Sequence, residues 1–103
     1  MTKSNEVTLW GKVYSVEETT DLYLPYDNLT GSIPSEIGEL TNLTSLDLCN
    51  NQLTGPIPDD IGYLTNLTQL KLNGNQLTGE IPESICDLNN IELRYLNFMP
   101  GFK

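Results

Sequence analysis

The chain has 103 residues, a formal net charge of −9 and a hydrophobic content of 38%. This length corresponds to one small domain, and the acidic balance disfavours nucleic acids and anionic membrane surfaces as partners because their phosphates carry the same charge. No apolar run reaches the length of a membrane-spanning helix, so we expect no membrane insertion, and the polar N-terminal stretch M-T-K-S-N-E-V-T lacks the apolar core of a signal peptide.

Residues 1–19 are predicted to form an N-terminal cap. The stretch V-T-L-W-G-K-V-Y-S-V at 7–16 is rich in β-branched and aromatic residues, which indicates a strand or a strand pair. Residues 10–19 also keep the spacing of the repeat that follows, because Val13 and Val16 lie 24 positions before Ile37 and Leu40. We therefore interpret 10–19 as the back half of a degenerate repeat that covers the apolar end of the first full repeat.

Residues 20–91 contain three full copies of a 24-residue unit. A fixed period of this length is typical of a solenoid, in which each repeat buries its single apolar side against its neighbours. The recurring apolar columns are Leu22, Leu46 and Leu70; Leu24, Leu48 and Leu72; Leu29, Leu53 and Leu77; Ile33, Ile57 and Ile81; and Ile37, Ile61 and Ile85.

Each unit predicts the same three elements. A short L-x-L strand comes first, and these strands must pair in parallel because every coil advances the chain in the same direction. The L-T-G-x-I-P stretch continues as an extended segment, since proline disfavours helix in the residue before it. Ile and Leu spaced three apart after the proline then predict a short 3-10 helical turn.

A polar column follows the strands and consists of Asp27, Asn51 and Asn75. A buried Asn amide both donates and accepts hydrogen bonds, so we expect it to bind backbone groups of its own turn and of the neighbouring coil. An ionised Asp27 can only accept, and we expect this to be tolerated because the first coil has only one full neighbour.

The repeat spacing fails at the C-terminus. Ile91 holds the position of Leu43 and Leu67, but the next column residue is Arg94. Leu93 or Tyr95 can replace it if the strand slips by one residue. We therefore predict that 92–103 contain the rest of a capping strand over 91–96 and a tail. The apolar tail residues either cover the end of the solenoid or form an exposed patch: Phe98, Met99 and Phe102.

The consensus L-x-x-L-x-L-x-x-N-x-L-T-G-x-I-P-x-x-I-G-x-L resembles the plant-specific class of leucine-rich repeats. That class occurs in receptor-kinase ectodomains and polygalacturonase-inhibiting proteins, and similar repeats occur in microbial and algal surface proteins. The resemblance implies an α/β fold: a right-handed solenoid with a parallel β-sheet on its concave face, a second short sheet from the L-T-G-x-I-P segments, and short 3-10 turns on the convex side. It also implies protein or peptide binding rather than catalysis, and suggests an extracellular or cell-surface location. The stretch Trp10-Gly11-Lys12-Val13 is similar to the core of the family's N-terminal cap, but no cysteine flanks it.

Catalytic and metal-binding patterns are absent from the sequence. It contains no histidine, no G-x-S-x-G and no phosphate-binding glycine loop. The adjacent carboxylates Glu17-Glu18 and Asp59-Asp60 are interpreted as solvated loop charges. We therefore expect a non-enzymatic protein with no cofactor and no metal.

The two cysteines, Cys49 and Cys86, occupy different positions in the repeat. Cys49 follows a strand on the concave side, whereas Cys86 takes the column of Gly38 and Gly62 on the side of the helical turns. A disulfide needs Cα atoms within about 7 Å, and a solenoid cross-section is wider than that. Two free thiols are predicted, with an intermolecular bond through Cys49 as the alternative.

Three N-x-[ST] sequons begin at Asn28, Asn42 and Asn66. The repeat consensus itself generates these triplets, so they are interpreted first as by-products of the repeat. In a glycosylating secretory pathway they become possible glycosylation sites, and Asn42 and Asn66 should then be used alike because they are equivalent.

The outward positions of the concave strands are the best binding candidates, with Tyr23, Asp47 and Lys71 as the central row. The leading hypothesis is a module that binds a protein or a peptide there, and the alternative is a self-assembling solenoid whose ends stack head to tail. A consensus-like engineered array would show similar repeats, but the irregular ends argue against it. The predicted binding residues are Asp21, Tyr23, Ser45, Asp47, Gln69, Lys71 and Asn73, flanked by Pro25 and Cys49.

Overall fold

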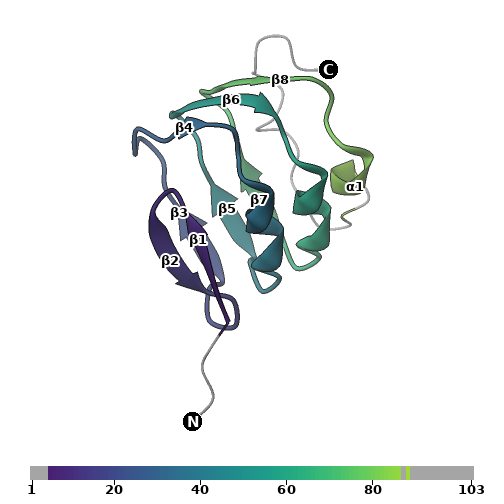
Figure 1. Cartoon of the computed structure of the whole chain (residues 1–103). Coiled ribbons are helices and arrows are strands. Elements are labelled where there is room, and N and C mark those ends of the chain that lie inside the picture. Colours follow the sequence, from purple (N-terminus) through teal and green to yellow (C-terminus); the bar gives the residue numbers. More distant parts are fainter. Residues whose placement is uncertain (1–4, 87, 89–103) are drawn as a thin grey trace.

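A computed structural model of the chain describes residues 5–86 and 88, and these form three solenoid coils beside an N-terminal hairpin (Figure 1). Each coil contributes one strand to a parallel sheet, one strand to a second short sheet, and one helical turn on the opposite side. The predicted capping strand over 91–96 and the tail with Phe98, Met99 and Phe102 lie outside the described residues.

The hairpin pairs β1 (Glu6–Leu9) with β2 (Lys12–Ser15) in antiparallel register. Its two-residue turn is Trp10-Gly11, and both residues have positive φ, 48° and 82°. This combination is typical of the type I′ turn, whose twist matches that of two antiparallel strands. Val7 and Leu9 on β1 are buried in the core, and β1 packs on the first helical turn, η1 (Ser35–Glu39). Strand β1 therefore covers the apolar end of the first coil.

The interpretation of residues 10–19 as the back half of a degenerate repeat does not hold for 10–15, which form the turn and the second strand of the hairpin. Val13 is 59% exposed and pairs with Thr8 in the hairpin, whereas Ile37, its supposed equivalent, is fully buried. The tight turn at Trp10-Gly11 folds the strand back on β1, so side-chain alternation turns Val13 to the solvent.

The repeat register begins only after the hairpin. The Glu17 carbonyl accepts a hydrogen bond from Asn42 Nδ2 at 3.0 Å. One period later, the Thr41 carbonyl accepts one from Asn66 Nδ2 at 3.3 Å. From Glu17 onward, the chain therefore makes the same contacts as the residues 24 positions later in the next coil.

The concave sheet contains three parallel strands in the order β3 (Asp21–Tyr23), β5 (Ser45–Asp47) and β7 (Gln69–Lys71). Its register equals one repeat, so Leu22 pairs with Leu46 and Leu46 with Leu70. These leucines point into the core, which confirms the predicted parallel stacking of the L-x-L strands.

The second sheet is formed by the L-T-G-x-I-P segments, in the order β4 (Thr30–Gly31), β6 (Gln52–Pro56) and β8 (Gln76–Thr78). Thr30 pairs with Gln52 and Thr54 with Gln76, a separation of 22 residues instead of 24. Adjacent coils are therefore displaced by two residues along this sheet. An even displacement keeps every side chain on its proper face, because side chains in a strand alternate with a period of two.

The convex side carries η1, η2 (Asp59–Tyr63) and the short helix α1 (Glu83–Cys86). The N–H of Ile37 bonds to the Pro34 carbonyl three residues before it, as the predicted 3-10 turn requires. The coils approach closely here: a Cβ built at Gly38 would lie 2.6 Å from the Asp60 carbonyl oxygen. The glycine is needed for this stacking distance.

The asparagine column links successive coils as predicted. Asn51 Oδ1 accepts hydrogen bonds from the N–H groups of Asp27 and Leu29, at 2.9 and 3.0 Å. Asn51 Nδ2 donates to the carbonyls of Leu24, in the preceding coil, and Leu48. The next asparagine of the column repeats the pattern one coil later, with bonds to both its own coil and the preceding one.

The Leu48→Ala variant is expected to lose about 2–5 kcal/mol of unfolding free energy, because Leu48 is fully buried and the shortened side chain leaves a cavity. Urea unfolding followed by circular dichroism measures the loss. Gln52→Ala, at an exposed position, serves as the control and should stay within about 0.5 kcal/mol of the parent. Equal losses in both variants would contradict the assignment of Leu48 to the core.

Asn51→Ala should cost about 3 kcal/mol or more, since it leaves several backbone N–H and C=O groups without partners at roughly 1–3 kcal/mol each. Asp27→Ala, at the exposed first position of the same column, should change stability by less than about 0.5 kcal/mol. The same unfolding experiment compares the two. A large effect at Asp27 with a small one at Asn51 would refute this account of the column.

Candidate binding surface

The register of the concave sheet brings the predicted binding residues into rows that run across the strands. Tyr23, Asp47 and Lys71 form one row. A second row consists of Asp21, Ser45 and Gln69. Their leucine neighbours within each strand are buried, so alternation directs both rows away from the core.

Exposure differs strongly within these rows. Tyr23 is 74% exposed, and Asp21 and Gln69 are exposed, whereas Ser45 and Lys71 are half-buried. Asp47 is only 7% exposed, which corrects the prediction that it forms part of the open surface. It belongs to the central strand, with a neighbouring strand on each side, and its Oδ1 accepts a hydrogen bond from the Cys49 N–H at 3.1 Å.

Cys49 is a free, half-buried thiol, as predicted. Burial raises the pKa of this thiol, and the hydrogen bond with Asp47 and the negative charge of Asp47 raise it further. Asn50 and the positive charge of Lys71 oppose this shift. A raised pKa keeps the thiol protonated and lowers its nucleophilicity at neutral pH. The side chain of Cys86 lies outside the described residues.

Asn73 follows the end of β7 by two residues. Its backbone carbonyl accepts a hydrogen bond from the Asn50 N–H at 2.9 Å. Its side-chain Oδ1 is buried and has no hydrogen-bond partner within the part of the chain that the structure describes.

Sequence reasoning missed Tyr26, which is 76% exposed and has a φ of 54°. The equivalent residues of the next coils, Asn50 and Gly74, have φ values of 58° and 76°. Asn and Gly are the residues that adopt this left-handed conformation most readily. A column composed of Tyr, Asn and Gly was therefore the available signal for a turn with positive φ.

The neighbouring Asp27 is exposed as well. Burial raises the pKa of the Tyr14 phenol, and the negative charge of Asp27 adds to the shift. The carboxylate of Asp27 thus lies near the Tyr14 side chain of the hairpin.

The sequons differ in their surroundings. The amide nitrogens of Asn42 and Asn66 both donate to a carbonyl of the preceding coil, so these two sites are structurally equivalent, as their repeat positions require. Asn28 is exposed and lies in the turn after β3, with a φ of 58°.

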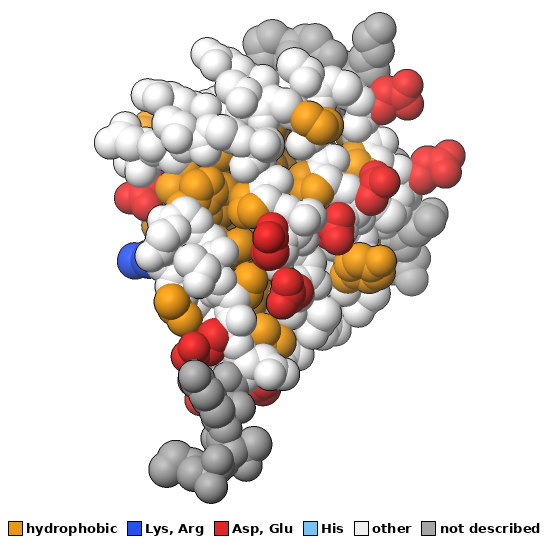
Figure 2. Space-filling model, viewed as in Figure 1, with side chains coloured by type: hydrophobic (Ala, Val, Ile, Leu, Met, Phe, Trp, Pro, Cys, Tyr) orange, Lys and Arg blue, Asp and Glu red, His pale blue; other side chains and the backbone are white. Residues whose placement is uncertain are grey.

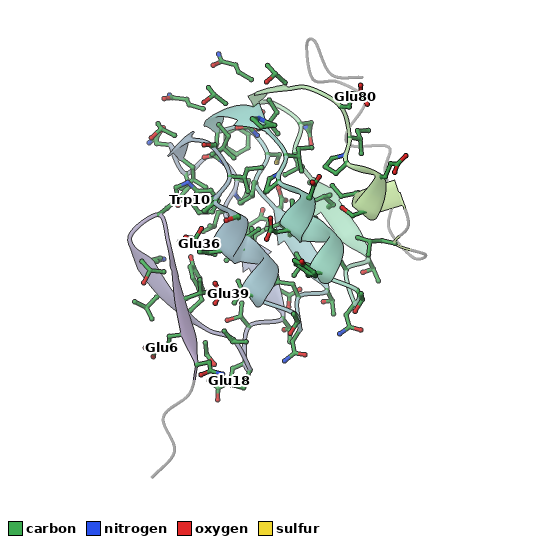
Figure 3. The ribbon with its side chains drawn as sticks, turned by 45° about the vertical axis from the view of Figure 1, so that its right-hand side comes forward. Glu6, Trp10, Glu18, Glu36, Glu39 and Glu80 are labelled. Carbon is green, nitrogen blue, oxygen red and sulfur yellow. The ribbon has the colours of Figure 1, made fainter. Side chains whose placement is uncertain are left out.

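Acidic side chains are distributed over the convex face formed by η1, η2 and α1 (Figure 2). Glu36 and Glu39 on η1 are labelled in Figure 3, and Tyr63 at the end of η2 is 66% exposed. Among the described residues, no group of three or more His, Cys, Asp or Glu side chains is placed to hold a metal ion. Within that same part of the chain, no helix has the length and apolar character needed to cross a membrane.

Comparison with known proteins identifies the repeat. The pattern of the leucine rich repeat matches residues 17–77 and 41–98. No curated protein matches the chain.

Several solved structures are similar. The plant peptide hormone receptor RGFR1, in complex with RGF2, is 52% identical with a TM-score of 0.69 over 73% of this chain and 12% of its own. The Arabidopsis receptor kinase HAESA, in complex with the peptide hormone IDA and the co-receptor SERK1, is 36% identical with a TM-score of 0.68 over 71% of this chain and 12% of its own. A chain of the BIR3–SERK2 complex from Arabidopsis thaliana is 32% identical with a TM-score of 0.63 over 93% of this chain and 49% of its own.

This chain therefore spans about an eighth of the two hormone receptors and about half of the third relative. The repeat pattern nevertheless covers most of the sequence, and its strands, second sheet and helical turns follow the period of that pattern. The chain belongs to the leucine-rich repeat family, in the form found in the ectodomains of plant receptor kinases.

Proposed function

We propose that this chain is a non-enzymatic module that binds an extended peptide, or an extended segment of a protein, across its concave sheet. Tyr23, which is 74% exposed and shares its row with the half-buried Lys71, is the observation that carries the proposal. The similar receptors RGFR1 and HAESA are described in complexes with RGF2 and with the peptide hormone IDA, which supports a peptide ligand. The proposed contact residues are Asp21, Tyr23, Ser45, Gln69, Lys71 and Asn73.

The size of the surface favours a peptide over a folded protein. Strands about 4.8 Å apart with a few outward residues each provide a few hundred Å². A stable interface between folded proteins needs about 800 Å² on each partner. An extended peptide lying across the strands needs less area, since Tyr23 and Lys71 can each contact a different side chain of the ligand.

We propose the same organisation as the sequence suggests: a cap in 1–19, three repeats in 20–91, and a terminal strand with a tail in 92–103. We also propose an extracellular setting, in line with the similar ectodomain of the plant membrane receptor kinase GASSHO1/SCHENGEN3. In that setting Asn42 and Asn66 are glycosylated to the same extent, because their environments are equivalent.

The alternative function, head-to-tail self-assembly, needs an apolar end that is open for stacking. At the N-terminal end, β1 already covers this surface with Val7 and Leu9, so the described structure favours peptide binding.

Selection of binders from a display library of random peptides tests the proposal. Peptides that bind the 103-residue chain should lose about tenfold or more in affinity on Tyr23→Ala combined with Lys71→Gln, since central aromatic anchors contribute more than about 1 kcal/mol to binding. Fluorescence anisotropy of the labelled peptides measures the affinity, and thermal unfolding checks that the double variant stays folded.

Tyr63→Ala is the matched control, because it removes a tyrosine of similar exposure from the convex side. Two results would refute the concave site. The peptides would bind the Tyr23→Ala, Lys71→Gln variant as tightly as the parent chain, or they would lose affinity only on Tyr63→Ala.

A further inference from the structure

Strand β3 forms one edge of the concave sheet, and only β5 pairs with it among the described strands. The Leu24 N–H donates to the Asp47 carbonyl at 2.9 Å, so the even-numbered residues of this segment bond toward β5. Alternation in a parallel pair then directs the backbone groups of Asp21 and Tyr23 to the opposite side. A strand edge of this kind offers N–H and C=O groups to an incoming extended chain.

The N-terminal hairpin leaves this edge open. It packs on η1 through β1, and neither of its strands packs on β3. The hairpin thus covers the apolar interior of the first coil without adding a strand to the concave sheet. The edge of β3 therefore remains separate from the apolar surface that β1 covers.

Two exposed tyrosines mark the same edge. Tyr23 is on β3, and Tyr26 follows three residues later in the turn. Tyr26 has a φ of 54° at a repeat position that Asn50 and Gly74 fill in the other coils. A tyrosine in this conformation is strained, and with 76% of its surface exposed it gains little from packing to offset that strain. Retention of strain by an exposed aromatic residue indicates a binding role.

The negative charges at this edge favour a ligand with positive charge. Asp21 lies on the same strand face as Tyr23, and Asp27 follows Tyr26 directly; both aspartates are exposed. Tyrosine rings and carboxylates together attract Lys and Arg side chains through cation–π and ionic contacts. The net charge of −9 disfavours a second copy of the chain as the occupant, because two such copies repel each other.

We propose that an extended, cationic peptide segment adds to the free edge of β3. Its backbone pairs with Asp21 and Tyr23, and its Lys or Arg side chains lie against the rings of Tyr23 and Tyr26 and near the carboxylates of Asp21 and Asp27. The proposal rests on the proposed function in taking a peptide as the ligand. It differs in placing a segment of that peptide along the edge of β3 instead of across the strands, and it adds the sign of the charge of that segment.

Three synthetic peptides test the proposal at physiological salt. The probe alternates arginine and threonine; a second peptide alternates glutamate and threonine; a third is the probe with N-methylated backbone amides, which cannot donate to the strand edge. Fluorescence anisotropy gives each affinity, and NMR chemical shifts of the labelled chain locate the contact. The probe should bind with shifts centred on residues 21–27, the glutamate peptide should not bind, and N-methylation should weaken binding about tenfold.

Variants of the chain separate edge binding from general attraction between opposite charges. Tyr26→Asn should weaken the probe about two- to fivefold while raising the melting temperature, since Asn accepts the left-handed conformation. Asp27→Asn should weaken it by a similar factor. Glu39→Gln removes the same charge from the convex face and should leave the affinity unchanged.

Several outcomes would overturn the proposal: equal binding of the arginine and glutamate peptides, equal effects of Asp27→Asn and Glu39→Gln, or full affinity in Tyr26→Asn. Concentration-dependent self-association of the chain that Tyr26→Asn abolishes would assign the edge to a second copy instead. Library peptides that lose affinity on Lys71→Gln but keep it on Tyr26→Asn would uphold the concave site and reject the edge.

Discussion

The hydrogen bonds of the asparagine column are the constraint on which the rest of the solenoid depends. The strands are only three residues long in each coil, so the concave sheet alone provides few bonds between coils. Asn51 and Asn75 add bonds at the point where the chain leaves the sheet, and each reaches back into the preceding coil. Because these amides satisfy buried backbone groups that no strand can reach, they hold the turns in place, and the apolar columns can then stack behind them.

Much of this architecture could be predicted from the sequence because repetition supplies three observations of every position. The parallel strands, the 3-10 turns and the asparagine bonds all follow from residues that recur with the period. The hairpin could not be predicted in the same way: Val13 fits the apolar column by spacing, but a local two-residue turn at Trp10-Gly11 determined its orientation. Where the repeat ends, local turn chemistry overrides the period.

The binding surface was less predictable for a related reason. Strand alternation correctly placed Tyr23, Asp47 and Lys71 in one row, but it carries no information on how far neighbouring strands bury a residue. Asp47 on the central strand is therefore covered, whereas Tyr23 on the edge strand is open. Tyr26 was overlooked because its repeat position holds a different residue in each coil, so the position does not stand out in the sequence. The three residues nevertheless share the left-handed backbone conformation. The fixed positions of the unit form the scaffold, and recognition is left to the variable ones.

The two-residue displacement in the second sheet has a geometric consequence for any longer array of these coils. In the concave sheet, equivalent residues of neighbouring coils pair directly with one another. In the second sheet, each strand is shifted by two residues, or about 7 Å, relative to its neighbour. The two sheets therefore differ in the shift between neighbouring strands, and successive coils must rotate about the long axis. An array of such coils becomes a superhelix, and an extended ligand bound along its concave face has to follow the same twist.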